Sequence, residues 1–177
     1  MQMWQQRVRQ VWAALHAVIT DADRELVQAY LNEAEQTLFW AMNLPDQYHC
    51  LGVVRSARQL AVGRADVEER FLIRLALLHD VGKKKGDVST KDKIAMVLLH
   101  RLAPGVRKWG REGRGGKVSN ARHAIHVYFH HPERSARLLA AAGCEAALVE
   151  AVKRQHKAPE AGEPPELTLL RQADDLN

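Results

Sequence analysis

Apolar residues recur along this chain at the three- and four-residue spacing that places them on one face of an α-helix. No segment alternates convincingly with a period of two, the pattern of a half-buried strand. The first apolar stripe consists of Trp4, Val8, Val11, Trp12, Leu15 and Ile19. It is short and interrupted by His16, so it predicts an amphipathic helix rather than a signal peptide or a membrane span. The whole pattern predicts an all-α protein.

Capping residues and helix breakers divide the rest of the chain into further helices. Thr20 and the aspartates after it can cap a second helix, and Gly63 ends a later one that begins near Asp46. Pro132 suits the first turn of a helix, so we expect one helix to end at His131 and another to begin there. The expected helices cover residues 20–31, 33–42, 46–62, 66–79, 91–102, 121–131, 132–143, 145–155 and 166–176.

Residues 104–122 break this pattern, with several glycines and many basic side chains against one acidic residue, Glu112. Such a segment predicts a mobile basic loop. Its candidates for phosphate contact are Arg107, Arg111 and Arg114. A solvated run of charge is the competing interpretation of the same residues.

The composition fits one soluble globular domain with a full core, since 46% of the 177 residues are hydrophobic and 27% are charged. Histidine is the residue in excess, with nine copies. The net charge of +5 and the pI near 9.4 favour an anionic partner, such as a nucleotide, a nucleic acid or a phosphorylated metabolite. Cys50 and Cys144 form no pattern, which predicts reduced thiols and a cytoplasmic protein without a membrane partner.

His79 and Asp80 stand side by side at the end of an apolar helix, where a metal ion can offset the cost of burying them. Ligands from separate helices can converge on one pocket. The candidate metal ligands are His49, His79, Asp80, His131, His156 and Asp174. Six nitrogen and oxygen donors exceed what a structural zinc needs and suit two transition-metal ions that share Asp80 as a bridge. His130 and Asp175 neighbour two of these ligands and stay open as alternatives.

These residues resemble the motifs of the HD superfamily of metal-dependent phosphohydrolases. His49, the His79-Asp80 pair and Asp174 match its ligand order, and Lys83 matches a lysine common in the HD-GYP branch and its relatives. The segment 131–135 reads His-Pro-Glu-Arg-Ser, similar to the His-Pro-Glu-x-Gly of dinuclear members, and residues 152–156 and 170–175 resemble later elements. The resemblance covers residues 45–177, although no Gly-Tyr-Pro follows His156. The layout is closer to small bacterial members that hydrolyse dinucleoside polyphosphates.

The resemblance implies a single HD-type helical domain over residues 44–177, with residues 1–43 as an N-terminal helical extension packed on it. It implies a metal-dependent phosphohydrolase with Asp80 and Lys83 as catalytic residues and a nucleotide or dinucleotide as substrate. The cofactor would be two divalent ions, with Fe or Mn ahead of Zn, Ni, Co or Mg. The expected substrate-binding residues are Lys83, His126, His130, Arg107, Arg111 and Arg114.

Two interpretations remain beside this one. His126 and His130 lie on one predicted helical face with His123, which could supply another ligand, line the substrate pocket or be a solvated polar stripe. An HD fold can also serve as a nucleotide- or RNA-binding regulatory module without turnover, although six candidate ligands favour an enzyme and nucleic acid is the less favoured partner. The sequence leaves the oligomeric state open.

Overall fold

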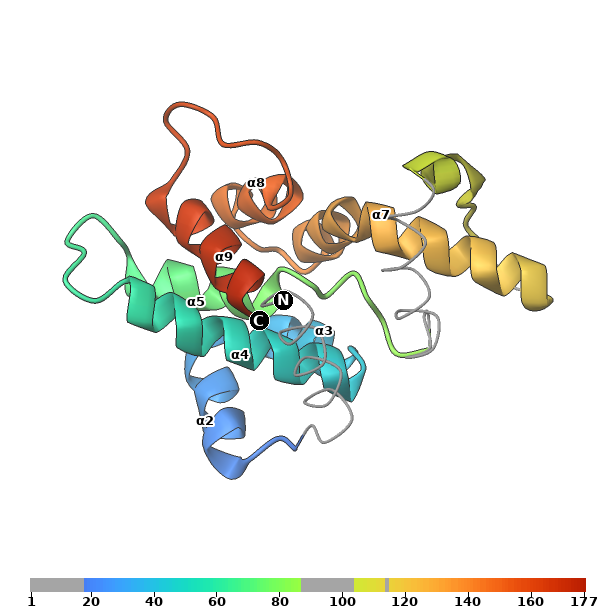
Figure 1. The fold of residues 1–177 in the computed structure, drawn as a ribbon. Coiled ribbons are helices and arrows are strands. Elements are labelled where there is room, and N and C mark those ends of the chain that lie inside the picture. Colours follow the sequence, from blue (N-terminus) through green and yellow to red (C-terminus); the bar gives the residue numbers. More distant parts are fainter. Residues whose placement is uncertain (1–17, 87–103, 114) are drawn as a thin grey trace, which may run out of the picture.

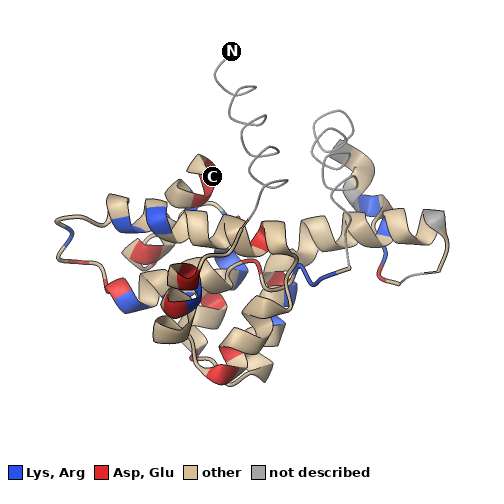
Figure 2. Cartoon of the chain, turned by 90° about the horizontal axis from the view of Figure 1, so that it is seen from below, with Lys and Arg blue, Asp and Glu red and all other residues tan. Residues whose placement is uncertain are grey.

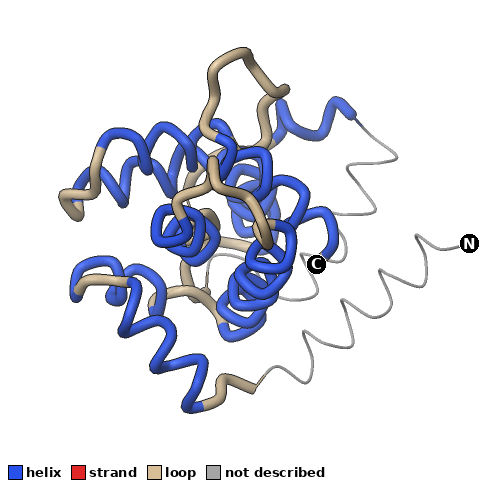
Figure 3. Tube along the Cα trace, turned by 90° about the vertical axis from the view of Figure 1, so that its left-hand side faces the viewer, coloured by secondary structure: helices blue, strands red, loops and turns tan. Residues whose placement is uncertain are grey.

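The computed structural model of the chain describes residues 18–86, 104–113 and 115–177. Within these ranges the fold is all-α, as predicted, and contains no strand (Figure 1, Figure 3). The one β-type pairing among them is an isolated antiparallel bridge between Met42 and Lys84. The helices predicted near the N-terminus and over residues 91–102 lie outside the described residues. None of the described helices has the length and apolar character that crossing a bilayer requires.

Two short capped helices precede the main body. Thr20 is the N-cap of helix α2 (Asp21–Tyr30), and Asn32 is the N-cap of α3 (Glu33–Trp40). Each N-cap forms a reciprocal capping box. Ion pairs attach both helices to later parts of the chain. Arg55 contacts Asp23 at 2.6 Å, and Arg74 pairs with Glu35. The boundary predicted after residue 43 stays a prediction.

The body consists of α4 (Leu44–Leu60), α5 (Glu69–Leu78), α8 (Ala146–Arg154) and α9 (Pro165–Leu176). Helix α4 packs against both α5 and α9, and α8 packs against α5 (Figure 1). Their apolar faces form one core, which includes Leu51, Val54, Leu72, Leu75, Leu148, Leu167 and Leu170. Acidic and basic residues are interspersed along the helices of this body (Figure 2).

Helix α7 (Lys117–Ala141) differs from the prediction in two ways. It continues through Pro132 as one helix, so the expected break between residues 131 and 132 is wrong and His131 lies in the helix interior. It also begins inside the segment predicted as a loop, which further contains the 3-10 helix η1 (Pro104–Trp109). Helix α7 packs against α8 on one side of the proline and against η1 on the other, and this packing keeps the helix continuous. The N-terminal half of α7, with η1, projects from the body (Figure 1).

Candidate metal centre

Asp80 lies at the centre of a cluster of ionisable side chains that α4, α5, α7, α9 and the segment after α8 bring together. Leu72, Leu75 and Leu78 bury one face of α5, and His79 is the C-cap residue of that helix. The chain therefore carries His79 and Asp80 directly into the interior, where each is only 1% exposed. The apolar run in the sequence thus explains where this pair lies.

One side of the cluster contains His49 from α4, His79 and Asp174 from α9. The His49 Nε2 atom lies 2.9 Å from Asp174 Oδ1, and the His79 Nε2 atom lies 3.8 Å from the same oxygen. Asp80 Oδ2 faces this group, 3.6 Å from His79 Nε2 and 4.0 Å from His49 Nε2. One ligand atom from each of His49, His79 and Asp174 lies within 4.8 Å of the other two, close enough to share an ion.

The other side contains His131 from α7 and His156, which follows the end of α8. Asp80 Oδ1 points this way and lies 3.3 Å from His131 Nε2. The Nε2 atoms of His131 and His156 are 3.0 Å apart. This separation would allow the two imidazoles to share one ion. The two oxygens of Asp80 thus face two separate groups of imidazoles.

Charge around Asp80 keeps the carboxylates of the cluster ionised. Burial raises the pKa of Asp80, but Lys83, whose Nζ atom lies 2.6 Å from Oδ2, and the nearby histidines hold it well below its usual range. The Asp80 charge likewise raises the pKa of Lys83, against the lowering effect of burial. Burial also raises the pKa of Asp174, yet the hydrogen bond from His49 and the charges around it lower the value to about 2. Ionised carboxylates are the form that binds metal.

Backbone carbonyls orient two of the imidazoles. The Nδ1 atom of His79 lies 2.8 Å from the oxygen of Ala76, and the Nδ1 atom of His131 lies 2.8 Å from the oxygen of Tyr128. A carbonyl only accepts, so each Nδ1 carries the hydrogen and each Nε2 presents its lone pair. Burial, with the charge of Lys83, also lowers the pKa of His131 to about 3, which keeps its ring neutral. This tautomer, held by a second partner, is typical of histidine metal ligands.

Two buried polar atoms also indicate that the residues of this cluster suit a divalent metal. His79 Nε2 and Asp80 Oδ1 are buried without a hydrogen-bond partner in the structure, although burying such atoms alone is costly. An ion among them would satisfy both atoms. Cys50 also lies near, with Sγ 3.8 Å from His79 Nδ1, but burial raises the pKa of its thiol well above the ordinary value. Cys50, His79 and Asp80 also have ligand atoms within 4.8 Å of one another, but the predicted donors are the imidazoles and carboxylates alone.

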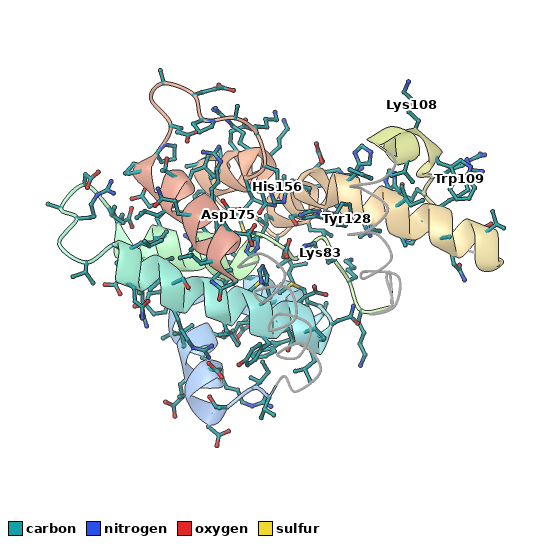
Figure 4. All side chains as sticks on the ribbon, viewed as in Figure 1. Lys83, Lys108, Trp109, Tyr128, His156 and Asp175 are labelled. Carbon is teal, nitrogen blue, oxygen red and sulfur yellow. The ribbon has the colours of Figure 1, made fainter. Side chains whose placement is uncertain are left out.

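The structure distinguishes the alternatives that the sequence left open. Asp174 faces His49, whereas Asp175, the next residue along α9, is exposed. His131 faces Asp80, whereas His130 lies about 100° around α7 from it. Lys83, Tyr128 and His156 lie close to one another in projection where α7, α8 and α9 meet (Figure 4). The six predicted ligands are thus brought together, and their roles stay a prediction.

His126 and His130 lie on a different face of α7. Their ring centroids are 4.7 Å apart, and they line a hollow of about 460 Å³ between α7 and α8, the α7–α8 hollow. Its walls also include Glu133, Arg137, Val149 and Lys153. His123 is buried instead, and its Nδ1 accepts a hydrogen bond from the Gly113 amide at 3.3 Å. His126 and His130 thus line this hollow, and their role in substrate binding stays a prediction.

The basic segment lies away from the cluster. Lys108 and Trp109 of η1 are well separated from Lys83 and His156 in Figure 4. The Arg111 amide donates to the Arg122 carbonyl at 3.1 Å, and residue 122 precedes residue 131 by about 14 Å of helix. The structure therefore does not bring Arg111 to Asp80. Arg114 lies outside the described residues, and Arg107 stays a prediction.

Sequence reasoning missed the residues that brace the cluster. Gln155 donates its side-chain amide to the His79 carbonyl at 3.0 Å. Arg171 donates to the Gln155 carbonyl at 3.1 Å and to the Arg154 carbonyl at 3.2 Å, and Glu163 pairs with its guanidinium. This network fixes the end of α8 and therefore His156. No periodicity or spacing in the sequence marks Gln155 or Arg171, because each donates a hydrogen bond to a backbone carbonyl of another segment.

Comparison with known proteins agrees with the arrangement. Residues 47–177 match the HD domain family. No curated protein and no solved structure matches the chain. The matched region contains all six residues of the cluster around Asp80, and it covers more than half of the chain. The chain belongs to the HD domain family.

Proposed function

We propose that the chain hydrolyses a phosphoester or phosphoanhydride bond of a nucleotide or dinucleotide, with a water activated by two divalent transition-metal ions. HD domains are in general metal-dependent phosphohydrolases, so membership of the family supports the reaction class. The observation that carries the two-ion proposal is the placement of Asp80. Its Oδ2 faces His49 and His79, and its Oδ1 faces His131 at 3.3 Å.

The residues have separate tasks in this proposal. His49, His79, Asp80 and Asp174 would hold one ion, and Asp80, His131 and His156 the other. Bound ions of this kind lower the pKa of water toward neutrality and polarise a phosphoryl oxygen. Lys83, one turn after Asp80, is a partly buried cation that can neutralise charge developing on the phosphate oxygens. We place the reaction in the cytoplasm, in keeping with two unpaired thiols.

The α7–α8 hollow is our candidate for binding the remainder of the substrate. His130 directly precedes His131 in the chain and Lys153 precedes His156 by three residues, so each wall of the hollow is followed by a proposed ligand. Imidazole rings offer a surface for stacking a base, and Lys153 and Arg137 offer positive charge for a phosphate. A volume of about 460 Å³ lies in the usual range for a small-molecule site.

The central test combines metal analysis with a nucleotide screen. Protein purified anaerobically and loaded with Mn or Fe should contain two ions per chain and release phosphate or a nucleotide from at least one substrate. Asp80→Asn should remove both properties, whereas the matched control Asp175→Asn should retain both, because Asp175 is exposed on the same helix as Asp174. An Asp80→Asn protein with full metal-dependent turnover would overturn the proposal. Tight nucleotide binding by the loaded protein without any turnover would favour the regulatory module instead.

A further inference from the structure

Pro132 occupies a position in α7 that a helix rarely accepts. It lies well inside the helix, which runs from Lys117 to Ala141, and it follows directly after His131. Proline has no amide hydrogen, so it cannot donate to the carbonyl four residues before it, and its ring crowds that carbonyl. For Pro132 this carbonyl belongs to Tyr128. A residue this costly to the helix calls for a compensating role nearby.

The Tyr128 carbonyl has a different donor in this structure. The Nδ1 atom of His131 lies 2.8 Å from the Tyr128 oxygen. Any other amino acid at position 132 would bring a backbone N–H to the same oxygen. Because proline brings none, the oxygen is available to the imidazole, and the ring is held with Nε2 facing Asp80 Oδ1 at 3.3 Å and His156 Nε2 at 3.0 Å.

His79 shows the same arrangement at a place that needs no proline. Its Nδ1 atom lies 2.8 Å from the oxygen of Ala76, which is also three residues earlier. Helix α5 ends at Leu78, so the Ala76 carbonyl belongs to the last turn, where carbonyls lack a helical donor. Both buried imidazoles of the cluster are therefore oriented by a carbonyl that has no helical donor four residues later. At Ala76 the helix ends before that donor, and at Tyr128 the position is occupied by Pro132.

We propose that Pro132 is a positioning residue for His131: it reserves the Tyr128 carbonyl for the His131 Nδ1–H and so directs the Nε2 lone pair into the cluster. The proposal rests on the proposed function only in treating that Nε2 as a metal ligand. With an amide at position 132, the backbone N–H would compete for the carbonyl. The imidazole would then be free to turn or to carry its hydrogen on Nε2, where it blocks metal binding.

The first measurement uses metal-free protein and so does not depend on catalysis. Nitrogen-15 NMR of the histidine rings should show His131 with Nδ1 protonated and Nε2 bare. In Pro132→Ala this signature should be lost or mixed. The second measurement is the affinity for Mn, which should fall about 10- to 100-fold for one of the two ions, the loss expected when the second partner of a ligand is removed. The other ion should be unaffected.

Two further variants separate the missing amide from the proline ring. Pro132→lactic acid, an amide-to-ester exchange, lacks both the ring and the N–H and should keep the original tautomer and metal affinity. Pro165→Ala is the matched control, since Pro165 lies in the first turn of α9, where an amide has no helical acceptor. Pro165→Ala should leave the His131 tautomer and the Mn affinity unchanged.

Several results would overturn the proposal. A Pro132→Ala protein with an unchanged His131 tautomer would do so, as would equal loss in the alanine and lactic acid variants. If the original protein bound only one ion yet lost the tautomer on Pro132→Ala, the proposed function would fail while the orienting role of Pro132 stood.

Discussion

The amide of Gly82 donates a hydrogen bond to the hydroxyl of Ser135 at 2.8 Å, and this contact joins the segment after α5 to α7. The approach is close enough that a Cβ atom on Gly82 would lie 2.5 Å from the His131 carbonyl oxygen and 2.8 Å from the Ser135 amide nitrogen. Glycine at position 82 therefore allows Asp80 and His131 to lie side by side. It also explains the serine where related motifs usually have glycine, because the Ser135 hydroxyl is the acceptor for this amide.

Gly82→Ala should push α7 away from Asp80. The clash is with backbone atoms, so we expect a loss of about 1–3 kcal/mol in the free energy of unfolding, together with weaker metal binding. Urea denaturation and metal titration measure the two effects. Gly105→Ala is the control, since a Cβ there meets nothing within 4 Å. Equal stability and equal metal affinity in the two variants would contradict the close approach.

Arg171→Met should loosen the end of α8. Removing the guanidinium takes the side-chain donor from the Gln155 and Arg154 carbonyls, the second of which keeps the Lys157 amide, and removes the nearest cation from Glu163. The expected cost is about 1–3 kcal/mol. Because His156 follows Gln155, we expect the affinity for one ion to fall while the other binds normally. Arg171→Lys should recover only part of the loss, because lysine cannot match the fork of bonds. Isothermal titration with Mn would show whether one or both binding steps change.

Lys83→Met should impair turnover more than substrate binding. In chelator-treated protein the Lys83 charge stabilises the ionised form of Asp80, so its loss should raise the pKa of the Asp80 carboxyl and weaken metal capture at acid pH. We expect kcat to fall by about 100-fold or more if Lys83 also neutralises the transition state, with a smaller change in KM. Lys153→Met, in the α7–α8 hollow, is the comparison and should affect mainly KM. An unchanged kcat together with an unchanged pH dependence of Mn binding would exclude this role of Lys83.

The neutral state of buried His131 makes stability depend on pH. Its pKa is lowered to about 3 in the folded protein, mainly by burial, against about 6.5 in an unfolded chain. Between these values the unfolded chain binds a proton that the folded one does not, so the free energy of unfolding falls as the pH decreases. From pH 6.5 to pH 5 the loss from this group should be about 2 kcal/mol in chelator-treated protein. His131→Gln should show a flatter dependence in urea denaturation, and identical curves would refute the assignment.

The sequence predicted the parts of the centre that depend on order and spacing. The apolar face of α5 placed His79 and Asp80 at the end of a helix, and the structure has them there. Membership of the HD family and the all-α fold were also predicted, and both are confirmed. These properties are local or motif-based, so one sequence is enough to show them.

What the sequence did not predict depends on tertiary contacts. Pro132 indicated a break, but packing along α7 keeps the helix continuous, and the carbonyl it frees binds a side chain instead. The choice between Asp174 and Asp175 depended on the rotation of α9, which no pattern gives to within one residue. Gln155 and Arg171 donate to backbone carbonyls of other segments. Every residue has such a carbonyl, so residue types in the sequence do not reveal these contacts.

His49 and Asp174 are 125 positions apart in the chain, yet their side chains meet at 2.9 Å. That contact exists only after α9 has docked on α4, which is among the most non-local packing events in the fold. A folding intermediate without α9 would contain the His79-Asp80 pair but not the complete donor set. Capture of the ion held by His49, His79 and Asp174 is therefore expected late in folding, where it stabilises the finished topology.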